Sequence, residues 1–168
     1  MQNKLSENGF GLLEIIISAA LISGSLFALA SVARLTLRAT GESFLGAKAS
    51  FLSEEALESA RFVRDNGWTA NITPLAAGVY YYPVFSAGEW VMAATSPGLV
   101  DGTFDRRVIF EDVYRRTSDD NIVPSDSPDS KYLDSNTVKV RALVSWPVVG
   151  EATSSVELVT FLTNLFGD

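Results

Sequence analysis

A carboxylate, Glu14, and the Gly9–Phe10 peptide bond four residues before it are the groups with the clearest chemistry in this sequence. Glu14 is the one charged residue between Phe10 and Ala33, and a charge inside membrane hydrocarbon costs about 2.5 to 3.5 kcal/mol on insertion scales. Cleavage after Gly9 would give Phe10 an ammonium group near Glu14 in depth. Two copies staggered by about one helical turn could then pair the amine of one with the carboxylate of the next, which favours assembly.

The segment that must position Glu14 is the apolar run over residues 10–33. A helix of this length reaches about 36 Å, enough to cross a membrane core of about 30 Å. Ala20, Gly24 and Ala28 recur every four residues and place small side chains along one helix face. Such a face permits close approach of a neighbouring membrane helix.

The letters N-G-F-G-L-L-E at residues 8–14, followed by the apolar run, resemble the processing site of type IV prepilins and pseudopilins. The resemblance implies that a prepilin peptidase removes a leader, residues 1–9, and methylates Phe10, and that Glu14 supports assembly. Two departures are Gly11, where the family more often has Thr or Ser, and the absence of Pro from the run.

The same resemblance implies the function and the partners. The chain is expected to be a structural subunit of a pilus-like filament used in adhesion, motility or DNA uptake, with a type II secretion pseudopilin as the alternative. Its expected partners are further copies and other pilins, the peptidase/N-methyltransferase, an assembly platform with its ATPase, and membrane lipid before assembly. It is expected in the cytoplasmic membrane as a single-pass precursor and then in an extracellular surface pilus, without a cofactor.

A conventional secretory signal is the other interpretation of the apolar run. Its cleavage motif would end at Ala30 or Ala33, so the mature chain would begin at Ser31 or Arg34 and be a secreted binding protein. Without cleavage, the chain would be a binding protein anchored by a single membrane span. The charge at Glu14 and a length beyond the usual 7 to 15 apolar residues argue against this interpretation.

Beyond the run, residues 34–66 predict an amphipathic continuation of the helix. Apolar residues recur at three or four positions, which is typical of a helix with one buried face. Asp65, Asn66 and Gly67 form a typical helix end. The predicted buried positions are Leu45, Ala49, Leu52, Ala56, Ala60 and Val63.

Residues 67–168 predict a globular head, so the fold class is α+β: a long helix packed on an antiparallel sheet of about four strands. The expected strand segments are residues 78–85, 89–94, 104–116, 137–146 and 155–165, the first two joined as a hairpin. In 104–116 we expect Val108, Phe110 and Tyr114 on one face and Arg107, Ile109 and Glu111 on the other. In 137–146 the alternating residues Val138, Val140, Ala142, Val144 and Trp146 should face the core.

The segment 117–136, predicted as a loop, contains weak calcium candidates. These are Asp119, Asp120, Asp126 and Asp129. Their spacing does not fit an EF-hand, and Asp, Ser and Pro are common in turns for local reasons, so no metal site is predicted.

No catalytic group is predicted, and the chain is not expected to be an enzyme. It has no His and no Cys, and its adjacent acid pairs, Glu54–Glu55 and Asp119–Asp120, diverge rather than converge. The net charge of -7 argues against binding nucleic acid through charge. The basic doublets Arg106–Arg107 and Arg115–Arg116 are expected to pair with acidic side chains.

Overall fold

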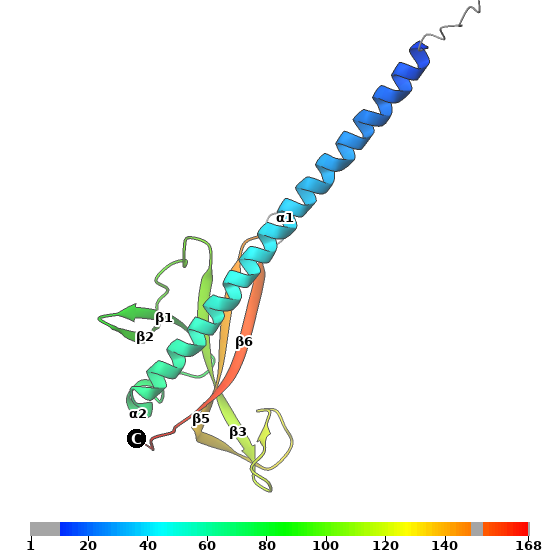
Figure 1. Ribbon diagram of the computed structural model, residues 1–168. Coiled ribbons are helices and arrows are strands. Elements are labelled where there is room, and N and C mark those ends of the chain that lie inside the picture. The colour runs from blue at the N-terminus through cyan, green and yellow to red at the C-terminus, as the bar shows by residue number, and fades with distance from the viewer. Residues whose placement is uncertain (1–10, 149–152, 168) are drawn as a thin grey trace, which may run out of the picture. The chain divides into compact units, whose positions relative to one another are not determined.

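The computed structural model describes residues 11–148 and 153–167 (Figure 1). Its contacts divide the chain into two units, Met1–Ser43 and Phe44–Asp168. The predicted leader, Gly9 and Phe10 lie outside the described residues.

One long helix, α1, runs from Leu12 to Asp65, as the sequence predicts. Every described residue up to Phe44 is exposed. Gly67, two residues after the helix ends, has a φ of 128°, a conformation that favours glycine. This allows the chain to turn directly into the short helix α2, Trp68–Asn71, which the sequence pattern did not predict.

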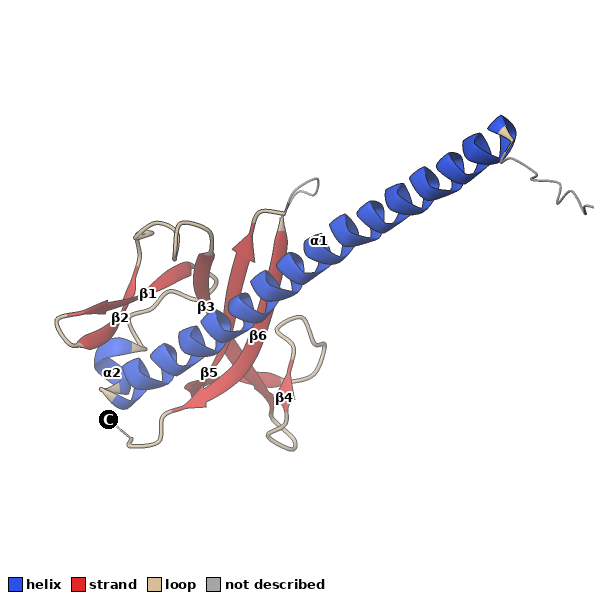
Figure 2. Cartoon of the chain, turned by 45° about the horizontal axis from the view of Figure 1, so that its top comes forward, coloured by secondary structure: helices blue, strands red, loops and turns tan. Residues whose placement is uncertain are grey.

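In the second unit, α1 packs on one face of an antiparallel sheet (Figure 2). The described residues form six strands in the order β2-β1-β3-β5-β6, with β4 pairing to β3. Their bounds are β1 Tyr80–Ser86, β2 Glu89–Ala93, β3 Asp105–Arg116, β4 Ile122–Val123, β5 Lys131–Trp146 and β6 Ser154–Thr163. The α+β class and the helix packed on a sheet are therefore confirmed, with two strands more than the predicted four.

The predicted helix face is buried against this sheet from Ala49 onward, and Leu45 is half-buried. Ala49, Ala56 and Ala60 have no exposed surface, and Leu52 and Val63 are also buried. Small alanines at these positions let the helix backbone approach the strands closely. Opposite them, β5 shows the predicted alternation, with Val140, Ala142, Val144 and Trp146 buried and Val138 half-buried against the core.

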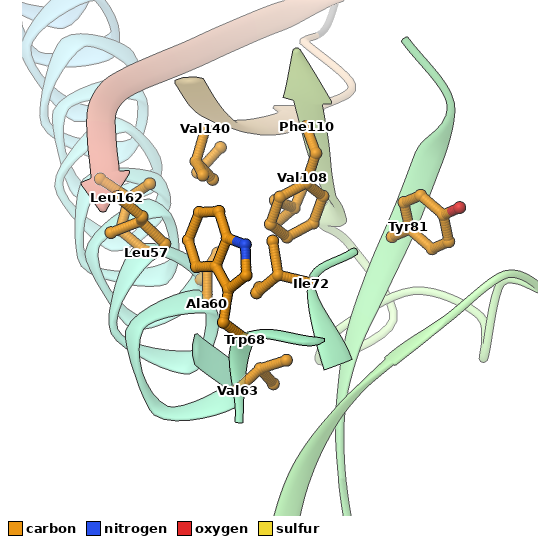
Figure 3. Packing of buried hydrophobic residues seen from close by; sticks show 12 residues of the cluster. Leu57, Ala60, Val63, Trp68, Ile72, Tyr81, Val108, Phe110, Val140 and Leu162 are labelled. Atoms are coloured by element: carbon orange, nitrogen blue, oxygen red, sulfur yellow. The ribbon is translucent and has the colours of Figure 1, made fainter. Parts of the chain in front are cut away.

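Trp68 lies at the centre of the larger hydrophobic cluster. Figure 3 shows its indole among side chains of α1, β3 and β5, including Leu57, Val108 and Val140. Trp68 is only 5% exposed. A second cluster joins Ala49 and Leu52 of α1 to Phe104 and Trp146, whose ring centroids are 6.1 Å apart.

Two details of the predicted sheet are wrong. First, β5 begins at Lys131, not at residue 137, because its first residues pair with Tyr114, Arg115 and Arg116 of β3. Secondly, Val113 is buried and Tyr114 only half-buried. The pairing register between β3 and β5 shifts between Asp112 and Tyr114, which reverses the alternation predicted for the end of β3.

The outer face of the sheet carries a charge network across three strands. Arg141 of β5 donates hydrogen bonds to Glu111 of β3 at 2.8 Å and to Glu157 of β6 at 2.6 Å, and Lys139 lies 2.8 Å from Glu111. A hydrogen bond from Lys139 is the main cause that holds the pKa of Glu111 below its ordinary value of 4.5; burial opposes it, and a hydrogen bond from Arg141 adds to it. The Arg141 hydrogen bond likewise lowers the pKa of Glu157.

We expect Arg141→Met to lower the free energy of unfolding by about 1 kcal/mol at neutral pH, because the network is partly exposed. Carboxylates with lowered pKa values stabilise the fold above their ordinary pKa, and this contribution is lost as the pH falls through the lowered values. The difference between wild type and variant should therefore shrink in acid. Urea unfolding at neutral and acidic pH measures this difference in the free energy of unfolding. Arg38→Met is the control, because Arg38 pairs with Glu42 in the first unit. An equal difference at both pH values would contradict the assignment.

The second unit should fold without the first. Both hydrophobic clusters consist of residues from Leu45 onward. We expect a chain beginning at Phe44 to give a dispersed NMR spectrum and cooperative unfolding in water without detergent. A collapsed spectrum with broad, non-cooperative unfolding would show that the core requires the preceding residues.

Candidate functional site

The first part of α1 is an exposed apolar surface. The helix contains an apolar stretch of membrane-spanning length, and none of that stretch is buried. The core helix of a globular domain would be mostly buried, whereas a large exposed apolar surface usually marks contact with a membrane or another protein. α1 is therefore long and apolar enough to span a membrane, although a secretory signal would share these properties.

Glu14 lies in the first turn of this helix. Its backbone N–H donates to the carbonyl of Gly11 at 2.9 Å, and the residue is exposed. Within the described residues its carboxylate has no ion-pair partner. A negative charge here interacts favourably with the helix N-terminus, which is a structural role for Glu14 even without a neighbouring chain.

Three hydroxyl side chains in the first unit donate hydrogen bonds within the helix itself. Ser25, Ser31 and Thr36 donate to the carbonyls four residues earlier at 2.8, 2.9 and 3.0 Å. Groups bonded in this way are compatible with lipid, where polar groups lack water. These hydrogen bonds could have been predicted from the sequence, because a regular helix always places a carbonyl four residues before each hydroxyl.

Ala20, Gly24 and Ala28 share one exposed face of α1. A Cβ added at Gly24 would meet no atom within 4 Å, so the face is open to a neighbour. At about 100° per residue, Gly24 lies about 80° around the helix from Glu14. The helix thus places the small residues on one face but does not bring them into one patch with the carboxylate.

Three exposed phenylalanines were not among the predicted residues. Phe44, Phe51 and Phe62 lie on α1 away from the sheet core and are 66, 70 and 37% exposed. Spacings of 7 and 11 residues keep them within about 20° of one line along the helix. The spacing can be read from the sequence, but the pattern of buried alanines and leucines in the same segment is stronger and determined the prediction.

Three of the four calcium candidates have other partners. Arg116 donates to Asp119 and to Asp129, both at 2.8 Å, and the hydroxyl of Tyr132 donates to Asp120 at 3.0 Å. The hydrogen bond from Arg116 is the main cause that lowers the pKa of Asp129. Asp126 is exposed, and within residues 11–148 and 153–167 no three acidic side chains converge on a position for a metal ion.

Both basic doublets pair with acidic side chains, as predicted. In each doublet the two arginines bind different carboxylates, which leaves little free positive charge for a polyanion. The pairs are Arg106–Glu55 at 2.6 Å, Arg107–Asp105 at 3.1 Å, Arg115–Asp134 at 2.6 Å, and Arg116 with Asp119 and Asp129 at 2.8 Å each.

Comparison of the chain with protein-family models, with curated proteins and with solved structures finds no match in any of the three.

Proposed function

We propose that this protein is a structural subunit of a type IV pilus-like filament. The observation that carries the proposal is the exposed apolar part of α1 with a single carboxylate in its first turn, continued by a helical segment built into a sheet domain. A peptidase cleaves after Gly9 and methylates Phe10. The mature chain is then held in the cytoplasmic membrane until a platform and its ATPase transfer it into the growing filament at the cell surface.

When the helix moves from lipid into a bundle of identical helices, the apolar surface that it exposes to water hardly changes. The hydrophobic contribution to the free energy of association is therefore close to zero. Helix packing and polar pairing then decide whether subunits associate. The face of Ala20, Gly24 and Ala28 provides close packing, and Glu14 pairs with the amine of Phe10 in a neighbouring copy. An incoming subunit that fails to form this pair leaves an uncompensated charge.

The exposed phenylalanines provide a second contact surface, on a different face of α1 and within the second unit. Phe44 and Phe51 remain on the surface although α1 is otherwise amphipathic there. In the filament they pack against neighbouring copies, which removes their apolar surface from water.

Immunogold labelling of the producing cells tests this proposal. Long fibres labelled along their length with antibody to residues 44–168 are expected. Label confined to the cell envelope, with secretion of other proteins lost on deletion, would instead favour a secretion pseudopilin. Label only in the culture supernatant as monomer would contradict the filament.

A further inference from the structure

A groove in the sheet domain lies between the end of α1, the short helix α2 and the β1–β2 hairpin. Its volume is about 520 Å³, within the range of about 300 to 1,000 Å³ that is common for small-molecule sites. Asn66 and Asn71 line it from the helix side, and Trp90 and Met92 line it from β2. All its lining residues belong to the second unit.

Three of the residues that line the groove carry neutral polar groups. The carboxamides of Asn66 and Asn71 and the indole N–H of Trp90 make no side-chain hydrogen bond within the described part of the chain. By contrast, Asn121 in the acidic loop donates to Asp119 at 2.7 Å. Each carboxamide offers two donors and one acceptor, so the groove presents several free hydrogen-bonding positions.

The ring of Trp90 is held in place by its neighbours. Its centroid lies 5.4 Å from that of Phe85 in an edge arrangement, and the guanidinium carbon of Arg106 lies 5.6 Å from the Trp90 centroid. Arg106 is itself fixed by Glu55 and by the carbonyl of Pro83, at 2.6 and 3.2 Å. A ring fixed in this way loses little freedom when a ligand binds.

The charge of the groove narrows the ligand class. Among the described residues that line it, Glu89 is the one ionisable side chain, so an anionic ligand meets a negative charge. A purely apolar ligand would leave three polar groups without partners, which is unfavourable. Among uncharged ligands, a polyhydroxylated ring satisfies both conditions, because its hydroxyls bond the carboxamides and its C–H face packs on the indole.

We propose that this groove binds a neutral saccharide. The proposal is independent of filament assembly, because it depends only on residues of the sheet domain.

NMR titration of the full chain tests it. The protein is kept in micelles of a zwitterionic detergent without a sugar headgroup, and methyl glycosides of glucose, galactose, mannose and N-acetylglucosamine are added in turn. With at least one glycoside we expect saturable shifts of the Trp90 indole and of the Asn66 and Asn71 side-chain amides. The indole of Trp146, in the other hydrophobic cluster, should not shift.

The double variant Asn66→Ala and Asn71→Ala should weaken this binding by about fivefold or more. Asn136→Ala, an exposed asparagine outside the groove, is the matched control and should bind as wild type does. If the double variant loses its dispersed spectrum, Trp90→Phe provides a second variant. It keeps an aromatic ring but removes the indole N–H, so it should also weaken binding. No saturable shift with any glycoside, equal shifts at Trp146, or shifts only with an added peptide would overturn the proposal.

Discussion

Glu14→Gln should leave the chain in the membrane but reduce its incorporation into filaments by at least about tenfold, equivalent to about 1.4 kcal/mol per subunit. The variant keeps the size of the side chain and removes the charge that, in the proposed filament, pairs with the amine of Phe10 in a neighbouring copy. Breaking one partner of a buried pair leaves the other charge uncompensated, which costs more than the pair itself contributes. Quantitative immunoblotting of sheared fibres and of membranes measures both quantities.

Two further variants test whether the loss depends on the negative charge at this position of the helix. Glu14→Asp keeps a negative charge in the first turn and should restore part of the incorporation. Glu42→Gln removes another exposed glutamate of α1, one that pairs with Arg38 at 2.9 Å, and should have little effect. Wild-type fibre levels in Glu14→Gln, or an equal loss in Glu42→Gln, would remove the proposed pair from the mechanism.

Trp68→Ala should destabilise the sheet domain by about 3 to 5 kcal/mol. The indole is nearly fully buried among residues of α1, β3 and β5, so truncation removes contacts with three elements and leaves a cavity. Because a domain of this kind is stable by only about 5 to 15 kcal/mol, the loss is a large fraction of the total. Denaturant unfolding of residues 44–168, followed by far-UV circular dichroism, measures the change.

Phe51→Ala is the matched control, since it removes an aromatic ring that is 70% exposed. Its effect on unfolding should stay within about 0.5 kcal/mol. If Trp68→Ala does not express, Trp68→Phe provides a milder test. Equal effects of Trp68→Ala and Phe51→Ala would contradict the described core.

The sequence predicted the parts of the fold that depend on one repeating pattern. Ala49, Ala56 and Ala60 are buried because a 3.6-residue period places them on one helix face. Val140, Ala142 and Val144 are buried because a strand alternates with period two. In both cases a local pattern and the tertiary packing agree.

The sequence failed where distant residues override local preference. Residues 131–136 include Asp, Ser and Asn, which favour turns, yet they extend β5 because Tyr132 and Leu133 pair with β3. Asp119 and Asp129 were candidate metal ligands in the sequence. Arg116, which donates hydrogen bonds to both, could be identified as their partner only from the folded chain. The groove beside Trp90 was missed for the same reason, since α1, α2 and β2 contribute to it together.

The most direct test of the account is mass spectrometry of the amino terminus of the mature natural protein. A chain that is cleaved and made ready to pair with Glu14 of its neighbour begins at Phe10, with one methyl group on its amine. A first residue at Ser31 or Arg34, or a retained Met1, would leave no amine at the required depth and would contradict the proposed assembly.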